Sequence, residues 1–77
     1  MPRITPVDWR VLECVFLRAG FKFARQKGSH RIYKRKGCWR PVVFPTPGII
    51  EAPVIKSNLR TAGLSREEYF ALLAECQ

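Results

Sequence analysis

The sequence lacks several features that would place it in well-known classes of protein. No apolar run approaches the roughly 20 residues that a membrane-spanning helix needs, and the N-terminal residues show no apolar signal-peptide core. A chain of 77 residues also leaves no room for a cofactor domain beside a substrate domain. We therefore expect residues 1–77 to form a single cytoplasmic domain with no membrane association.

Cysteine is scarce and is not spaced for metal binding. The three cysteines lie at positions 14, 38 and 76, with no CxxC pair, and the chain has one histidine. An odd number of widely separated thiols argues against a disulfide framework, and a structural zinc site needs four clustered ligands. We expect no metal and no cofactor, with Cys14 buried as a thiol and Cys76 in a frayed terminus.

Acidic residues are absent from the middle of the chain, although the formal net charge of the whole is +8. Residues 22–40 hold eight basic residues and no acidic one, whereas the flanking segments hold six of each kind. The basic block comprises Lys22, Arg25, Lys27, Arg31, Lys34, Arg35, Lys36 and Arg40. About two or three such charges would protect a strand edge from aggregation, so eight indicate a surface that attracts phosphate backbones.

Four aromatic residues are interleaved with these charges. They are Phe21, Phe23, Tyr33 and Trp39. Aromatic rings beside cations can stack on nucleobases, but they can equally be core residues, and we expect the two phenylalanines to be core. The combination favours a domain that contacts nucleic acid.

The spacing of apolar residues predicts a helix followed by three strands. The helix covers 6–19, with Thr5 as its cap and Gly20 as its stop. Alternation of apolar and polar residues predicts antiparallel strands over 21–26, 29–35 and 39–44, joined by tight turns at 27–28 and 36–38.

A loop around Ile49 and Ile50 should lead into two further helices. Pro53 opens the first, in which Ile55, Leu59 and Ala62 share a face before Gly63 ends it. The segment 65–68 reads as a capping box that starts the second. The order of elements predicts an α+β domain with its helices on one face of a small antiparallel sheet.

His30 is the candidate catalytic residue. It follows a glycine turn inside the basic block, and histidine exchanges protons near neutral pH. Triads and paired-carboxylate schemes need acids that this block lacks. The orientation of His30 stays open: burial of Ile32 would turn it toward the helices, whereas burial of Tyr33 would turn it outward beside Lys34.

Three segments together resemble the HicA toxins, also called YcfA-like proteins, of HicA–HicB toxin–antitoxin pairs. The segments are Ala19-Gly20-Phe21, the stretch 25–30 that ends in Gly28-Ser29-His30, and the stretch 59–65 with Glu67-Glu68. The resemblance runs over roughly residues 5–73. It implies a fold like that of double-stranded-RNA-binding domains, metal-independent cleavage of mRNA, a HicB-like antitoxin partner, and His30 as the catalytic histidine.

The chain departs from this family at one point. Many members have a second histidine near a proline after the third strand, whereas the segment 45–48 reads Pro-Thr-Pro-Gly. A mechanism with two histidines is therefore excluded, and the general acid must be another group, such as Lys27, Tyr33 or water.

Our hypothesis from the sequence is an endoribonuclease toxin that cleaves single- or double-stranded mRNA. His30 would be the general base, and Lys27, Arg31 and the backbone amides of Gly28 and Ser29 would stabilise charge on the phosphate. The expected RNA contacts are Arg25, Tyr33, Lys34, Arg35, Lys36 and Arg40. A HicB-like antitoxin would cover residues 25–40. The alternatives are a non-catalytic RNA-binding module and an accessory domain that prefers duplex DNA.

Overall fold

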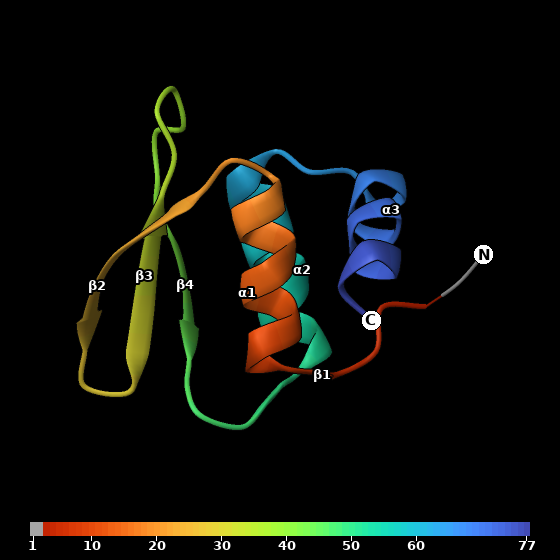
Figure 1. Cartoon of the computed structure of the whole chain (residues 1–77), viewed down its shortest axis with the longest axis horizontal. Helices are drawn as coiled ribbons and strands as arrows, with labels where there is room; N and C mark the ends of the chain where they lie inside the picture. Colours follow the sequence, from red (N-terminus) through yellow and green to blue (C-terminus); the bar gives the residue numbers. More distant parts are fainter. Residues whose placement is uncertain (1–2) are drawn as a thin grey trace.

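A computed structural model describes residues 3–77 and confirms an α+β fold with a helix, three antiparallel strands and two further helices in the expected order. The elements are β1 (Val7–Asp8), α1 (Trp9–Arg18), β2 (Lys22–Lys27), β3 (His30–Lys34), β4 (Val42–Pro45), β5 (Ile49–Ile50), α2 (Ala52–Ala62) and α3 (Arg66–Cys76). The helices α1 and α2 lie against one face of the β2-β3-β4 sheet, and α3 lies beyond them (Figure 1). Within residues 3–77, no helix covers the opposite face of the sheet (Figure 1).

The three-stranded sheet is a meander in which β3 is the central strand. Phe23 pairs with Tyr33, and Tyr33 pairs with Val42 on the other side. An irregularity between Phe23 and Arg25 shifts the register of β2, which is typical of a bulge in an edge strand. The other edge strand is closed by α2, because the Asn58 side chain accepts from the Val43 N–H (3.0 Å) and donates to the Val43 carbonyl (2.9 Å).

The core lies between the sheet and the helix pair. Tyr33 and Phe44 stack with ring centroids 5.1 Å apart, and Phe16 of α1 stacks on Phe44 at 6.1 Å. The expected shared face of α2 is confirmed by the burial of three residues, Ile55, Leu59 and Ala62. Burial of apolar side chains from all three layers is what holds the layers together.

The start of α1 differs from the expectation of residue 6. Val7 and Asp8 form β1, which pairs with β5 through Val7 and Ile50. Asp8 rather than Thr5 is the cap, since its carboxylate accepts from the Arg10 N–H at 2.9 Å. The stretch around Ile49 is therefore a short strand and not a loop; its partner is distant in the chain, so local patterns could not identify it.

The bounds of the three strands of the sheet differ less from the expectation. They begin and end within one residue of the expected bounds, except that β4 starts at Val42 and not at residue 39. Trp39 lies in the β3–β4 connection and is 92% exposed. Pro41 cannot donate a ladder hydrogen bond, which is consistent with a strand that begins after it.

The expected ends of the C-terminal helices are confirmed. Gly63 ends α2 in the left-handed conformation, with φ of 71°. Ser65 and Glu68 form the capping box of α3: the Glu68 N–H donates to the Ser65 hydroxyl (3.0 Å), and the Ser65 N–H donates to the Glu68 carboxylate (2.9 Å). These hydrogen bonds lower the pKa of Glu68.

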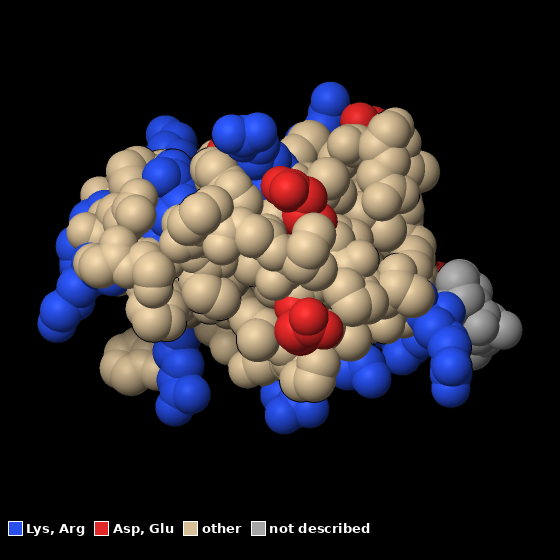
Figure 2. Space-filling view, turned by 90° about the horizontal axis from the view of Figure 1, so that it is seen from below, with Lys and Arg blue, Asp and Glu red and all other residues tan. Residues whose placement is uncertain are grey.

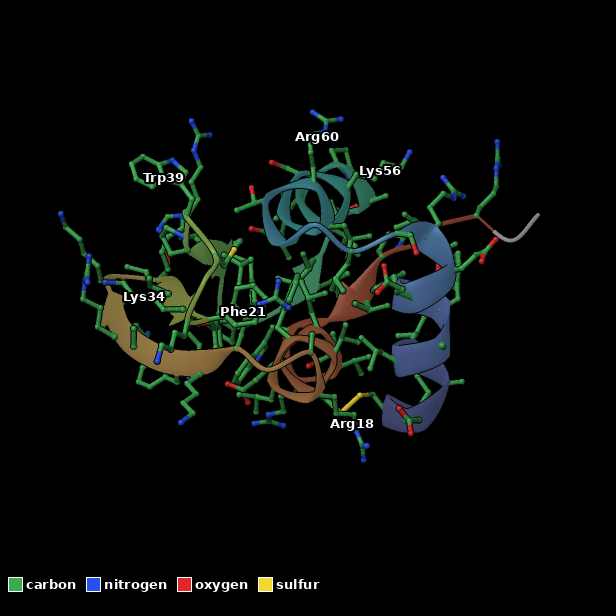
Figure 3. All side chains as sticks on the ribbon, turned by 90° about the horizontal axis from the view of Figure 1, so that it is seen from above. Arg18, Phe21, Lys34, Trp39, Lys56 and Arg60 are labelled. Atoms are coloured by element: carbon green, nitrogen blue, oxygen red, sulfur yellow. A yellow bond between two sulfur atoms is a disulfide. The ribbon has the colours of Figure 1, made fainter. Side chains whose placement is uncertain are left out.

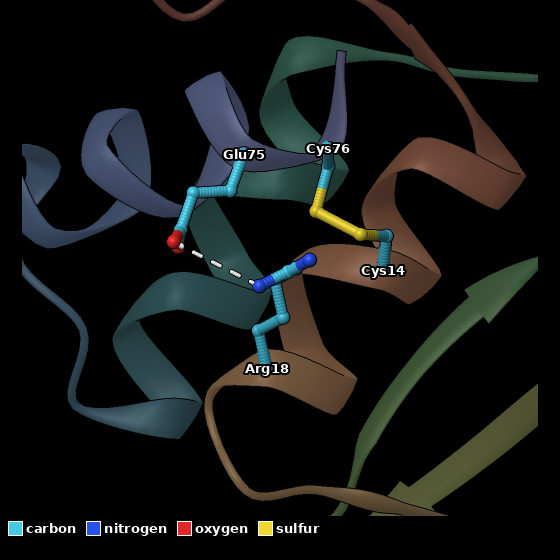
Figure 4. Close-up of a disulfide and its surroundings, with 4 residues drawn as sticks. All are labelled: Cys14, Arg18, Glu75 and Cys76. Carbon is cyan, nitrogen blue, oxygen red and sulfur yellow. Dashed lines mark ion pairs between the residues drawn. A yellow bond between two sulfur atoms is a disulfide. The ribbon is translucent and has the colours of Figure 1, made fainter.

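A disulfide joins Cys14 to Cys76, so the expectation of two unpaired thiols was wrong (Figure 4). The helix α3 packs on α1, and this packing brings two Cα atoms 62 positions apart in the chain to 5.9 Å, within the range that a disulfide spans. An ion pair between Arg18 and Glu75 (3.8 Å) lies beside it. Cys38 remains free.

Candidate functional site

The uncovered face of the sheet carries the only histidine. Tyr33 and Ile32 are both buried, but only Tyr33 belongs to the core cluster, whereas Ile32 (8% exposed) lies outside it. By alternation His30, Ile32 and Lys34 lie on the face opposite Tyr33, and the orientation left open by the sequence is outward. Lys27 of β2 and Pro45 of β4 are the direct cross-strand neighbours of His30. Residues directly opposite each other share a face.

Four cations share this surface with His30. We define the outer face as Lys22, Arg25, Lys27, His30 and Lys34, all of which are exposed. Lys and Arg side chains gather over the sheet at the left edge of the molecule in Figure 2, while acidic side chains lie nearer the middle. The structure thus brings together three expected site residues, Arg25, Lys27 and Lys34, on the face that presents His30.

The turn before His30 is tied to a neighbouring loop. Gly28 has a φ of 60°, a conformation that favours glycine. The Ser29 carbonyl accepts from the Thr46 N–H at 2.6 Å and from the Thr46 hydroxyl at 3.3 Å. Thr46 is itself buried. These bonds hold the segment 45–48, which lacks the second histidine of the family pattern, directly beside the His30 end of β3.

Arg31 does not share the outer face. Its guanidinium lies on the helix side of the sheet, where it donates to Glu13 of α1 (3.1 Å), to the Tyr33 hydroxyl (2.9 Å) and to the Gln26 side chain (3.1 Å). It also stacks over Phe23 at 4.1 Å. Its charge is therefore compensated by a carboxylate from outside the basic block, and the structure does not bring Arg31 to His30.

Tyr33, an expected RNA contact, is equally unavailable. Its hydroxyl donates to the Glu13 carboxylate, and its ring stacks on Phe44. Burial, followed by this hydrogen bond, raises the pKa of Tyr33 to about 12. A phenol that holds its proton this firmly and faces the core is not placed to donate a proton at His30.

Arg35 is also internal. It donates to the Ala19 carbonyl and to the Ala62 carbonyl, both at 2.9 Å, and it lies over the Phe21 ring at 4.6 Å. These carbonyls end α1 and α2, where the helix dipole favours a positive charge. Arg35 therefore links the two helices to the sheet, whereas Lys36 and Arg40 of the same connection are exposed.

The residue beside the site that sequence reasoning missed is Glu13. It lies on α1, nine positions before the basic block begins, and its partners are on β3. The sequence indicated its partners only in that Arg31 and Tyr33 are two positions apart, which puts both side chains on the same face of β3. Parity alone does not reveal which acidic residue meets them.

The described residues offer no preformed metal site and no membrane span. Within 3–77, no three His, Cys, Asp or Glu side chains come together. None of the helices in that range is both long and apolar enough to cross a bilayer.

Comparison with known protein families identifies a relationship for this chain. A family model described as the HicA toxin of bacterial toxin–antitoxin matches residues 9–64, a range that includes α1, the whole sheet and α2. No curated protein matches the chain.

Proposed function

Because the chain belongs to the HicA toxin family of bacterial toxin–antitoxin systems, we propose that it acts as a metal-independent endoribonuclease on mRNA, with His30 as its catalytic residue. The observation that supports this most strongly is the placement of His30, exposed at the end of β3 on a face with four cations and no covering helix. Such a face attracts an RNA backbone and leaves it in contact with a proton acceptor.

The chemistry uses the 2′-hydroxyl of the RNA as nucleophile. His30 removes the hydroxyl proton, the 2′-oxygen attacks the adjacent phosphorus, and the bond from phosphorus to the 5′-oxygen breaks. The products are a 2′,3′-cyclic phosphate and a 5′-hydroxyl, so the leaving oxygen must gain a proton. Lys27 lies directly across from His30 and either donates that proton or stabilises the negative charge on the phosphate oxygens. The backbone amides of Gly28 and Ser29 also stabilise this charge.

The remaining expected contacts divide by location. Arg25 and Lys34 on the outer face bind phosphates on either side of the cleaved bond, and Lys36 and Arg40 extend this surface along the β3–β4 connection. Arg31, Tyr33 and Arg35 instead hold β3 and the helices in position.

Replacing His30 with Ala tests the assignment. We expect His30→Ala to abolish RNA cleavage and growth arrest while RNA binding is retained, because the side chain is exposed and makes no core contact. A matched control is Lys22→Ala, at the far end of the outer face, which should weaken RNA binding but leave the cleavage rate of bound RNA unchanged. Undiminished cleavage by His30→Ala, or equal cutting of RNA without 2′-hydroxyls, would refute the mechanism.

A non-catalytic RNA-binding module is the second candidate, favoured by the absence of the second histidine beside His30. It predicts that the wild-type protein binds RNA without turnover. Product analysis of the wild type decides between the two, since a 2′,3′-cyclic phosphate forms only if the protein cleaves.

The family implies a cognate antitoxin. We place it on the outer face and over residues 25–40, where an acidic partner finds complementary charge and covers His30. Protection of His30 from chemical modification in the complex tests this placement.

A further inference from the structure

Trp39 is the large apolar side chain most exposed to water among the described residues, at 92%. It lies in the connection between β3 and β4, at the end of the sheet opposite the turn that precedes His30 (Figure 1). Binding residues concentrate on loops held by a rigid scaffold. The family comparison and the catalytic proposal leave Trp39 without a role.

The connection that carries Trp39 is fixed to the helices by residues that precede the indole. Before it, Arg35 bonds the carbonyls at the ends of α1 and α2. Directly before it, the Cys38 N–H donates to the Arg35 carbonyl at 3.0 Å, and the Cys38 sulfur lies 3.6 Å from the Thr61 carbonyl of α2. The backbone on which Trp39 sits is therefore held in place while the ring remains in water.

The surroundings of Trp39 are cationic. Lys36 and Arg40 are exposed in the same connection, and the described stretch 35–41 contains no acidic residue. Figure 3 shows Trp39 and Arg60 of α2 on the same side of the molecule, with Lys56 one turn away on α2. This is a phosphate-attracting surface next to a flat aromatic ring.

The pattern fits a nucleobase better than a protein surface. Protein hot spots lie within a patch of other contact residues that exclude water. The other exposed large apolar residues, Leu17, Phe23 and Ile49, belong to other elements. A nucleobase needs only one π face and a nearby cation for its phosphate.

We propose that Trp39 is a base-stacking site for single-stranded RNA, with Arg40 and Arg60 binding the neighbouring phosphates. This inference rests on the proposed function and names its substrate class. The length of β3, about 13 Å from His30 to Lys34 at the usual rise per residue, separates the stacking site from the catalytic residue. Only an unpaired strand offers a free base face to Trp39, because duplex bases are stacked on each other.

Binding to a short, fluorescein-labelled RNA that is 2′-O-methylated throughout, and so resists cleavage, tests the proposal. We expect Trp39→Ala to weaken binding of the single strand about 5- to 150-fold, and Trp39→Phe to keep most of the affinity. Binding of a 2′-O-methylated hairpin duplex should change little. Unfolding midpoints establish that each variant is folded.

Arg60→Gln should reduce the salt dependence of single-strand binding by about one phosphate contact. Its matched control is Arg18→Gln on the opposite side of the molecule, which should leave the salt dependence unchanged (Figure 3).

The outcomes separate this inference from the proposed function. Equal binding by the wild type and Trp39→Ala overturns the stacking site but leaves the nuclease proposal intact. Unchanged RNA binding with loss of antitoxin binding by Trp39→Ala also overturns it and makes the indole a protein contact. No RNA binding by the wild type refutes both.

Discussion

At the scale of single residues, a cluster of Glu13, Arg31 and Tyr33 on the helix side of the sheet holds β3 in position. The side chains of the outer face are exposed instead. Arg31 and Glu13 are joined at 3.1 Å, with side chains 21% and 23% exposed. Removing one charge of such a pair leaves the other poorly compensated. We expect Glu13→Gln to lower the free energy of unfolding by about 1–2 kcal/mol, measured by urea denaturation.

The same variant should lower the pKa of Tyr33, because the Glu13 carboxylate raises it. This titration also affects stability: the raised pKa stabilises the fold below pH about 10, and that contribution is lost as pH rises through about 12. Absorbance titration with Tyr33→Phe as reference follows the phenol.

Glu75→Gln is the matched control for the stability loss expected of Glu13→Gln, since the ion pair of Glu75 with Arg18 is about half exposed and contributes little to the free energy of unfolding. An equal loss of stability in both variants would contradict the argument.

At the scale of elements, α3 is the helix whose attachment depends most on one covalent bond. It packs on α1 and is joined to that helix by the Cys14–Cys76 disulfide. Closing a loop of this length removes entropy from the unfolded chain. We expect reduction, or Cys76→Ser, to lower the free energy of unfolding by about 4 kcal/mol, with faster amide exchange in α3 than in the sheet.

Urea denaturation with and without dithiothreitol measures the effect, and Cys38→Ser serves as control because this thiol is free. Identical midpoints in both conditions would mean that α1–α3 packing alone sustains α3. Arg35 acts at the same scale without a covalent bond, since it joins the ends of α1 and α2.

At the scale of the whole molecule, the net charge of +8 is arranged so that the outer face and the β3–β4 connection carry uncompensated cations. An acidic antitoxin on this surface would exclude RNA and shield His30 together. We expect diethyl pyrocarbonate to modify His30 in the free toxin and much more slowly in the complex, as measured by peptide mass spectrometry. The chain has one histidine, so the signal is unambiguous. Equal modification in both states would show that inhibition leaves His30 open.

Much of the fold followed from local patterns. The capping box at Ser65, the stop at Gly63 and the strands depend on residues within a turn or a few positions of each other, and they were predictable apart from the start of β4. The start of α1 was not, because β1 is created by pairing with Ile49–Ile50, far along the chain. Local patterns therefore could not predict contacts between residues that are far apart in the sequence.

The sequence by itself determined that positive charge surrounds one histidine, and that this histidine follows a glycine turn. Only the tertiary structure decided which cations face outward with His30 and which turn inward. Arg31 and Arg35 lie inside because Glu13 and two helix-end carbonyls meet them there. The partners come from distant segments, and a charge that is partly removed from water is stable only where such partners exist. Composition records the charges, but packing determines which of them remain free for RNA.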